Sequence, residues 1–319
     1  MIYIFITILL FISILGYFKI ADYYNIIDHP NERSSHSEIT IRGGGVIFVL
    51  AALVAVIMHP DYWLPMLGLF IIGAVSFADD RITLSSKVRI VVHLIAVTLL
   101  FIYCNAFALP VYVWLLLYFI AIGTINAYNF MDGINGITGT YSMVVLGGLQ
   151  YVNLRQVAFV QQDMIWLPML ACAVFLFFNF RKKAKCFAGD VGSVSVAFWI
   201  VMLLIQLILK TNNWIYILFL AVYGADSVTT IIHRILLRQN VLKPHRLHLY
   251  QIMVNEQKLP HLRVATGYAL LQGVIIFFIV NSALPSKPGL FVIILLPLVI
   301  IYILLKTIFT KHQSENNIA

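Results

Sequence analysis

Apolar segments separated by short polar connections recur along the whole chain. Most of them approach the about 20 residues that an α-helix needs to cross the hydrocarbon core of a bilayer. We therefore expect an all-α, polytopic transmembrane helical bundle of about eleven spans, forming one domain over residues 1–319. The expected spans are 2–20, 43–58, 62–78, 88–104, 109–126, 137–152, 164–180, 191–209, 213–231, 264–281 and 288–309.

Composition agrees with this pattern. Hydrophobic residues make up 61% of the chain and charged residues 11%, whereas soluble domains carry about 25% charged residues. A soluble helical bundle is therefore excluded. The three cysteines lie in or beside apolar segments without CxxC spacing, so they predict neither a disulfide framework nor a zinc site.

The basic residues predict how the chain is oriented. Of the 21 Lys and Arg residues, only Arg155, Lys210 and Lys287 fall on the short connections of one side, and the other 18 lie on or next to the longer connections of the other side. By the positive-inside rule the longer connections are cytoplasmic. An odd number of spans then places the N-terminus outside and the C-terminus in the cytoplasm. We expect membrane lipid, and not nucleic acid, to surround these charges.

Acidic and amide side chains gather on the same side of the membrane. Asp79 and Asp80 end the third span, Asn129 and Asp132 lie in the stretch NAYNFMDGINGI, and Asp190 opens the eighth span. Carboxylate and amide oxygens are the ligands that Mg²⁺ prefers, together with substrate phosphates. We therefore expect a magnesium site. For each residue taken singly, capping of a helix end remains an alternative.

Cationic side chains accompany these acids. Lys87 follows the aspartate pair, PHRLHLYQ carries two histidines and an arginine, and RKKAK (181–185) precedes Asp190. Cations and a metal ion together suit a diphosphate. For RKKAK we favour contact with anionic lipid. For Gly43–Gly45, close helix packing and phosphate contact remain equal alternatives.

Two ionisable residues lie within expected spans. An acid in a span needs a partner, and for Asp226 we expect a structural pair with Arg234, eight residues further along the chain. For His93 we expect packing or an interhelical hydrogen bond, and no catalytic role.

In this order, the motifs resemble those of the polyprenyl-phosphate N-acetylhexosamine-1-phosphate transferase family. The resemblance covers nearly the whole chain and rests on five ordered motifs, each of them unspecific alone. These are PNERSSH…RGGG, FADDR…K, NAYNFMDGINGI, FLFFNF…FAGDVGS and HRLHLYQ.

The resemblance implies roles for the matching residues. Asp190 and Asn129 would be ligands of Mg²⁺, with Mn²⁺ as an alternative, and Asp79 or Asp80 would act on the lipid phosphate. Asp132 would lie near the uridine ring, Lys87 would contact the diphosphate, and the histidine loop would lie near the sugar phosphate. The implied substrate-binding residues are Lys87, Asp132, His245, Arg246, His248, Asn31, Arg33 and His36.

The resemblance also implies a reaction. The acceptor would be undecaprenyl phosphate and the donor a UDP-N-acetylhexosamine, with release of UMP, at the cytoplasmic face of a bacterial inner membrane. In the members of this family that serve peptidoglycan synthesis, the histidine loop carries a run of three histidines, whereas here it reads HRLH. This difference argues against a MurNAc-pentapeptide donor. It favours the members that initiate O-antigen, capsule or other surface glycans. UDP-linked GlcNAc, GalNAc, QuiNAc and FucNAc remain open, as does a homodimer.

A transporter of a phosphorylated or anionic metabolite is the alternative from another class. Transporters hold their binding groups near the midplane of the bilayer on broken helices. Here the polar groups gather at span ends on one side, which favours an enzyme at the membrane surface.

Overall fold

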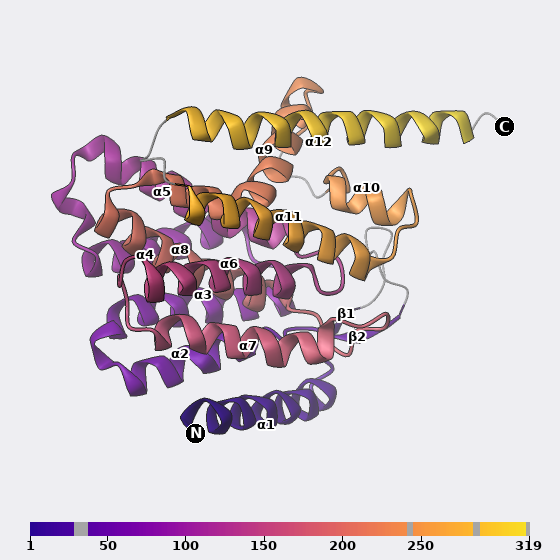
Figure 1. The fold of residues 1–319 in the computed structure, drawn as a ribbon. Coiled ribbons are helices and arrows are strands. Elements are labelled where there is room, and N and C mark those ends of the chain that lie inside the picture. The colour runs from indigo at the N-terminus through magenta and orange to yellow at the C-terminus, as the bar shows by residue number, and fades with distance from the viewer. Residues whose placement is uncertain (29–37, 241–244, 283–287, 317–319) are drawn as a thin grey trace.

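The computed structural model describes residues 1–28, 38–240, 245–282 and 288–316 of the chain. In this part, helices pack side by side into a bundle, and a short hairpin of two strands lies at one end (Figure 1). The helices are α1 (Ile2–Tyr23), α2 (Val46–Met58), α3 (Trp63–Ile82), α4 (Ser86–Tyr103), α5 (Val111–Met131), α6 (Ile137–Arg155), α7 (Asp163–Asn179), α8 (Gly189–Thr211), α9 (Ala221–Leu236), α10 (Leu249–Asn255), α11 (His261–Asn281) and α12 (Pro288–Asn316), with the 3₁₀ turns η1 (Pro60–Tyr62), η2 (Ala106–Ala108) and η3 (Trp214–Leu220).

Every expected span is helical, so the predicted fold class is confirmed. Within the described residues, eight helical segments are long and apolar enough to cross a membrane. The difference from the expected eleven has a physical reason: α2 and α7 are shorter apolar helices, and α6 buries polar side chains such as Gln150 and Asn153. η3 and α9 together form the ninth expected span.

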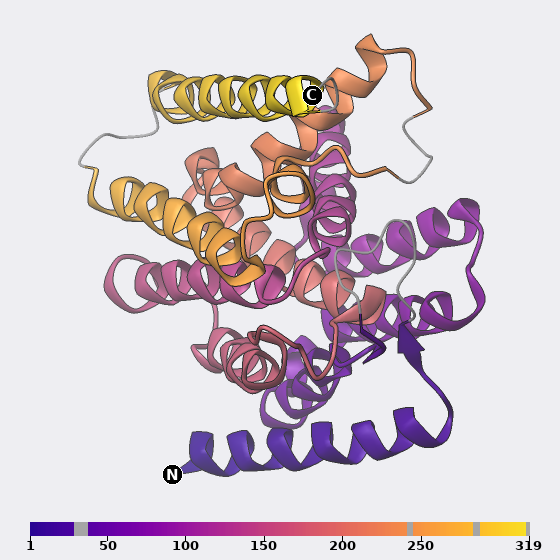
Figure 2. The ribbon, with the colours of Figure 1, turned by 90° about the vertical axis from the view of Figure 1, so that its right-hand side faces the viewer.

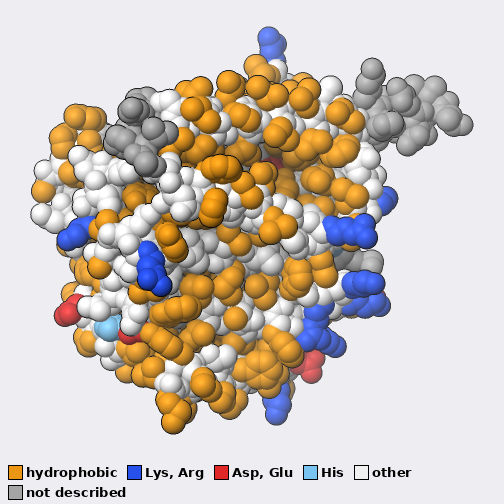
Figure 3. All heavy atoms as spheres, viewed as in Figure 1, with side chains coloured by type: hydrophobic (Ala, Val, Ile, Leu, Met, Phe, Trp, Pro, Cys, Tyr) orange, Lys and Arg blue, Asp and Glu red, His pale blue; other side chains and the backbone are white. Residues whose placement is uncertain are grey.

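Helix α8 forms the centre of the bundle. Its apolar window is 94% buried, and it packs against α3 and α5. Helices α1 and α12 lie on opposite outer sides (Figures 1 and 2), and their windows are only 28% and 17% buried. Apolar side chains cover much of the outer surface in Figure 3. An apolar exterior around an equally apolar centre is the arrangement that lipid, and not water, requires.

One end of the bundle carries the chemistry-bearing connections. We call it the loop end: the β-hairpin, loops 132–136 and 180–188, and α10. Lys and Arg side chains gather at this end in Figure 3. The end of α12 also lies there, whereas the start of α1 lies at the opposite end (Figure 1). Connections far apart in the sequence therefore meet in one region.

The β-hairpin was not predicted. Strand β1 (Ile27–Asp28) pairs antiparallel with β2 (Thr40–Ile41). Ile41 also forms a parallel bridge to Cys186. The strands are only two residues each, too short for a periodic pattern to reveal them. The hairpin attaches the segment after α1 to the loop that leads into α8.

Candidate active site

Glycine contacts set the start of α8 against the start of α2. A Cβ atom added to Gly45 would lie 2.0 Å from Cα of Gly192. The N–H groups of Gly44 and Gly45 donate to the carbonyl oxygens of Phe187, at 2.8 Å, and Ala188, at 3.0 Å. These two donors are already used within the protein. Of the two alternatives for the triple glycine, the structure therefore favours close packing.

The Asp80 carboxylate binds the backbone of the first turn of α8. It accepts hydrogen bonds from the backbone N–H groups of Asp190, at 2.9 Å, and Val191, at 3.2 Å. The Asp80 side chain is fully buried, with 0% exposure. A carboxylate at the N-terminus of a helix satisfies donors that have no partner within the helix. Asp80 thus fixes the backbone that carries Asp190.

Arg42 links three carboxylates at this place. Its Nε donates to Oδ1 of Asp80 at 2.7 Å, and its terminal nitrogens lie 3.7 Å from Oδ1 of Asp28 and 3.8 Å from Oδ1 of Asp190. Burial alone would lower the pKa of the Arg42 guanidinium, but the carboxylates of Asp80, Asp190 and Asp28 outweigh it and raise that pKa. Arg42 therefore remains positively charged, and its single charge offsets only part of the negative charge of the three carboxylates.

A cavity of about 180 Å³ opens beside Asp190. Five separate parts of the chain form it: the hairpin, the stretch from the end of α5 to the start of α6, the segment from the end of α7 to the start of α8, α10, and the start of α11. The lining residues are Asp28, Arg42, Asn129, Asp132, Gly133, Ile134, Asn135, Asn179, Phe187, Ala188, Gly189, Asp190, Gln251 and His261.

The stretch NAYNFMDGINGI supplies two of the predicted residues. Helix α5 continues to Met131, beyond the expected end at 126, so Asn129 lies on its last turn and beside the Asp190 carboxylate. Asp132 follows the helix and accepts a hydrogen bond from the Thr138 hydroxyl at 2.7 Å. Burial raises the pKa of Asp132 to about 6. Asn129, Asp132 and Asp190 thus share one cavity.

Two asparagines without a predicted role brace this stretch. The Asn179 Oδ1 accepts from the N–H of Gly136 at 2.7 Å, and its amide donates to the carbonyl of Cys186 at 2.9 Å. Asn135 donates to the carbonyl of Arg181 at 2.8 Å. Asn179 is the one polar residue in FLFFNF, and this isolation was the signal that could have revealed it.

Gly136 allows the turn into α6. Its φ is +86°, and an added Cβ would lie 2.4 Å from the ring of Phe180. Both the left-handed backbone and the close ring favour glycine at this position.

Asp79 and Lys87 do not line the cavity. Asp79 accepts a hydrogen bond from the N–H of Leu84, and its Oδ2 lies 3.4 Å from Nη1 of Arg89, so its carboxylate joins the end of α3 to the start of α4. Lys87 is exposed on the first turn of α4. The structure therefore places the two predicted catalytic aspartates in supporting contacts, and their chemical roles remain predictions.

His245 and His248 are not among the residues that line the cavity. His248 is only 2% exposed, and His245 packs 4.9 Å from it, measured between ring centroids. Burial, together with the positive charge of Arg234, lowers the pKa of His245 to about 4, so His245 is neutral at neutral pH. Gln251, three residues after His248, reaches the cavity lining. Substrate contact by either histidine remains a prediction.

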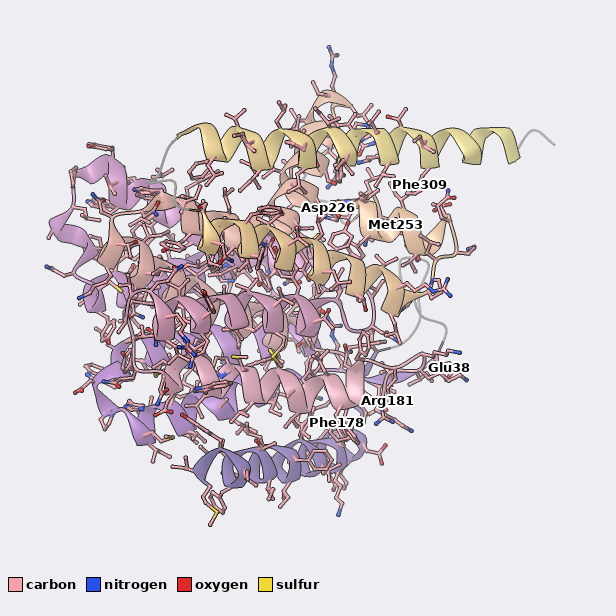
Figure 4. All side chains as sticks on the ribbon, viewed as in Figure 1. Glu38, Phe178, Arg181, Asp226, Met253 and Phe309 are labelled. Atoms are coloured by element: carbon pink, nitrogen blue, oxygen red, sulfur yellow. The ribbon has the colours of Figure 1, made fainter. Side chains whose placement is uncertain are left out.

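A larger basin of about 1200 Å³ adjoins the cavity and shares Asn135, Phe187 and His261 with it. Glu38 and Arg181 mark this region of the loop end in Figure 4. Lys183 forms an ion pair with Glu38 across the basin. The basic residues that line it are Lys182, Lys183, Arg246, Lys258 and Arg263, and the acidic ones are Glu38 and Glu256. The excess of positive charge suits an anionic ligand.

The remaining predicted residues, Asn31, Arg33 and His36, lie outside the described residues.

The expected pair between Asp226 and Arg234 is wrong. The partners of Asp226 are His248, whose Nδ1 lies 3.1 Å from Oδ1, and Tyr268, whose hydroxyl donates to Oδ2 at 2.6 Å. Arg234 instead donates to Gln239 and to the carbonyl of Asn240. Proximity in sequence suggested Arg234, but the packing of α11 and the segment before α10 on α9 decided the partners. His93 is buried, as expected.

The cavity fits a divalent cation in its chemistry. The carboxylates of Asp28, Asp132 and Asp190 line it, Asp80 lies directly behind, and Arg42 is the one arginine or lysine among the lining residues. Within the described residues, no three His, Cys, Asp or Glu side chains are arranged as a complete metal site. An oxygen-rich, incompletely ligated site is what Mg²⁺ bound jointly by protein and substrate phosphates requires.

Comparison with known proteins agrees with the resemblance of the motifs. Residues 62–208 match the family described as glycosyl transferase family 4. The chain is 26% identical over 312 residues to a probable undecaprenyl-phosphate N-acetylglucosaminyl 1-phosphate transferase of Bacillus subtilis (strain 168), covering 90% of this chain and 83% of that protein.

Two further relatives match shorter parts of the chain. An undecaprenyl-phosphate α-N-acetylglucosaminyl 1-phosphate transferase of Salmonella typhi is 25% identical, over 70% of this chain and 68% of the relative. A phospho-N-acetylmuramoyl-pentapeptide-transferase of Lactobacillus acidophilus is 24% identical, over 59% of this chain and 67% of the relative. The apolar helices and these relatives together indicate a multi-pass membrane protein related to phospho-sugar transferases. The match over residues 62–208 and these relatives agree with the family resemblance that the motifs carry.

Proposed function

We propose that the protein transfers an N-acetylhexosamine 1-phosphate from a UDP-sugar to undecaprenyl phosphate, releases UMP, and so initiates a lipid-linked surface glycan. The observation that carries this proposal is the shared cavity of Asn129, Asp132 and Asp190 at the loop end of an apolar bundle. Such a site reaches both water and lipid. The proposed location is the bacterial inner membrane, with the loop end in the cytoplasm.

The donor would occupy the cavity and the adjoining basin. Asn129 and Asp190 would hold Mg²⁺, which neutralises charge on the donor's two phosphates when bound. Asp132 would lie near the uridine ring, and Lys182 and Arg246 of the basin would attract the anionic nucleotide. The two hollows share lining residues, so one ligand can extend through both.

The attacking group would be the phosphate of the lipid. It forms a bond to the β-phosphorus of the donor, and the bond from that phosphorus to UMP breaks. A phosphate monoester has its second pKa near about 6 and is mostly a dianion at neutral pH. A strong general base is therefore unnecessary. The proton balance of the reaction needs no group on the protein.

The contacts of the aspartate pair support positioning roles. Asp80 already accepts from Arg42 and from two N–H groups of α8, and its side chain has no exposure. Asp79 accepts from Leu84 and pairs with Arg89. Carboxylates with these partners are poor nucleophiles. This favours direct attack by the lipid over a covalent phospho-sugar intermediate on an aspartate.

The test uses the purified protein in lipid nanodiscs. Radiolabelled UDP-GlcNAc, UDP-GalNAc, UDP-QuiNAc and UDP-FucNAc would each be incubated with undecaprenyl phosphate and Mg²⁺. The expected result is an organic-extractable product with one donor, abolished by a chelator and restored by Mg²⁺ or Mn²⁺. Uptake of a labelled anion into vesicles without any lipid product would instead support a transporter. A burst of UMP without lipid acceptor would support the covalent path.

A further inference from the structure

Asp226 is a buried acid that the proposed reaction does not use. It is 2% exposed and lies on α9, deeper in the bundle than Glu38 and Arg181 (Figure 4). It borders an apolar cavity of about 340 Å³ between α9, α10, α11 and α12. A charge in such surroundings is costly unless donors surround it.

Five donors converge on the Asp226 carboxylate. Oδ1 accepts from Nδ1 of His248 at 3.1 Å, from the N–H of Leu249 at 3.1 Å and from the hydroxyl of Thr230 at 3.3 Å. Oδ2 accepts from the hydroxyl of Tyr268 at 2.6 Å and from the N–H of Tyr250 at 3.4 Å. This carboxylate joins α9 and α11 to the three residues that begin α10.

Two of those residues, His248 and Tyr250, contact the stretch that carries Asn129. The Tyr250 hydroxyl donates to the carbonyl of Phe130 at 2.8 Å, between Asn129 and Asp132 in the sequence. The same hydroxyl would lie 2.3 Å from a Cβ added to Gly133. The ring of His248 packs 6.3 Å from that of Phe130. The start of α10 is thus pressed against the turn that carries the predicted metal ligand.

The contact with Asp226 also determines which nitrogen of His248 carries a proton. An ionised carboxylate can only accept hydrogen bonds, so Nδ1 must donate. The other nitrogen, Nε2, is buried and has no hydrogen-bond partner among the described residues. A buried polar atom without a partner needs a ligand or a water. Because the two ring nitrogens point in different directions, Nε2 is turned away from Asp226.

We propose that Asp226 is a positioning residue for the transferase reaction: by accepting from Nδ1 of His248 and from the N–H groups that begin α10, it holds the start of α10 against the turn that carries Asn129. This inference rests on the proposed function for the identity of the reaction that the site performs. The hold of Asp226 on His248 does not depend on it. Tyr268 supports Asp226 from the opposite side.

The first experiment is spectroscopic and needs no turnover. Protein with ¹⁵N-labelled histidine in nanodiscs would be compared with Asp226→Asn, and the loss of one signal in His248→Gln identifies the His248 ring. We expect a protonated, hydrogen-bonded Nδ1 in the wild type and a displaced signal in Asp226→Asn. An unchanged His248 signal in Asp226→Asn overturns the proposal.

The second experiment is a double-mutant cycle on turnover. Asp226→Asn keeps the size of the side chain but brings an amide to a place where five donors point, and we expect kcat to fall by about 10- to 100-fold. The double variant Asp226→Asn/His248→Gln should have a kcat less than about twofold below that of His248→Gln alone, because both changes remove the same contact between Asp226 and His248. Ser227→Ala is the matched control: Ser227 is buried beside Asp226 on α9, and its hydroxyl has no hydrogen-bond partner among the described residues. Turnover of this variant should stay within about threefold of the wild type.

The outcomes distinguish a failure of the Asp226 proposal from a failure of the proposed function. Effects that multiply in the double variant show that Asp226 acts only on the fold, and overturn the proposal. Near-normal turnover of Asp226→Asn overturns it as well. A wild-type protein that makes no lipid product counts against the proposed function, while the spectra still decide whether Asp226 controls His248. Elution as one species on size exclusion and thermal unfolding confirm that each variant is folded.

Discussion

Gly45→Ala should displace Asp190 relative to the other residues that line the cavity. The added Cβ would lie 2.0 Å from Cα of Gly192 and 2.7 Å from both the N of Gly192 and the carbonyl oxygen of Ala188. All three are backbone atoms, which cannot rotate away as a side chain can. Ordinary contact begins at 3.4 Å, so the starts of α2 and α8 must separate by about 1.4 Å. Asp190 lies on the same turn of α8 as Gly192.

The effect on catalysis should exceed the effect on stability. A displacement of about 1 Å at a reacting group can cost about 100-fold in rate, and we expect a loss of this order in kcat. Overpacking costs about 1–3 kcal/mol in stability, which shifts the thermal midpoint but leaves the bundle folded. The assay is release of UMP from the preferred UDP-sugar in nanodiscs, measured together with thermal unfolding.

Gly123→Ala is the matched control. Gly123 lies on α5, the helix that carries Asn129, and an added Cβ there meets no atom within 4 Å. Alanine is favoured over glycine in a helix by about 0.5–1 kcal/mol, so this variant should be as active as the wild type. Wild-type turnover by Gly45→Ala, with the control also active, would refute the view that the glycine contact sets the geometry of Asp190.

Three further predictions concern charge at the site. Asp190→Ala should lower kcat by at least about 100-fold because a metal ligand is lost, whereas Asp61→Ala at the opposite end should turn over normally. Asp132 has a folded pKa of about 6, above its ordinary value, so the folded protein binds its proton more tightly than the unfolded chain and loses stability as pH rises from about 4 to 6. Asp132→Asn should therefore flatten the fall of the thermal midpoint over this range. Lys182→Ala in the basin should raise KM for the UDP-sugar by about 3- to 10-fold, less at high salt, with Lys210→Ala as the control.

Each of these has an outcome that contradicts it. Turnover near the wild-type rate in Asp190→Ala would remove this residue from the metal site. Parallel stability curves for the wild type and Asp132→Asn would show that the carboxyl of Asp132 is not held protonated by burial. Equal KM values for Lys182→Ala and Lys210→Ala would mean that the basin does not receive the nucleotide.

The sequence alone was sufficient to locate the apolar helices and the chemistry-bearing segments between them, but it gave eleven expected spans where eight helical segments of the described residues are long and apolar enough to cross a membrane. An apolar run long enough to cross hydrocarbon is a local property, so each expected span could be located without knowledge of its neighbours. Alternation of basic connections predicted that the stretches around Asn129 and Asp190 face the same side. The structure places both in one cavity.

The sequence could not distinguish the carboxylates that line the cavity from those that are buried in contacts with other residues. Asp80 and Asp190 look alike in the sequence, yet Asp80 is fully buried under Arg42 and α8, while Asp190 lines the cavity. The difference arises from contacts between residues 38 and 110 positions apart. No local pattern records such contacts.

Tertiary packing also decided the partners of Asp226 and the use of the glycines. The sequence showed that an acid within a span needs a donor, but which donor it meets depends on which helices lie beside α9; it is His248 and not Arg234. Likewise, Gly45 could serve a phosphate or a helix until the backbone of Gly192 was seen to occupy the space. Hydrophobic length is encoded residue by residue along the chain, whereas the pairing of buried polar groups exists only after the helices have packed.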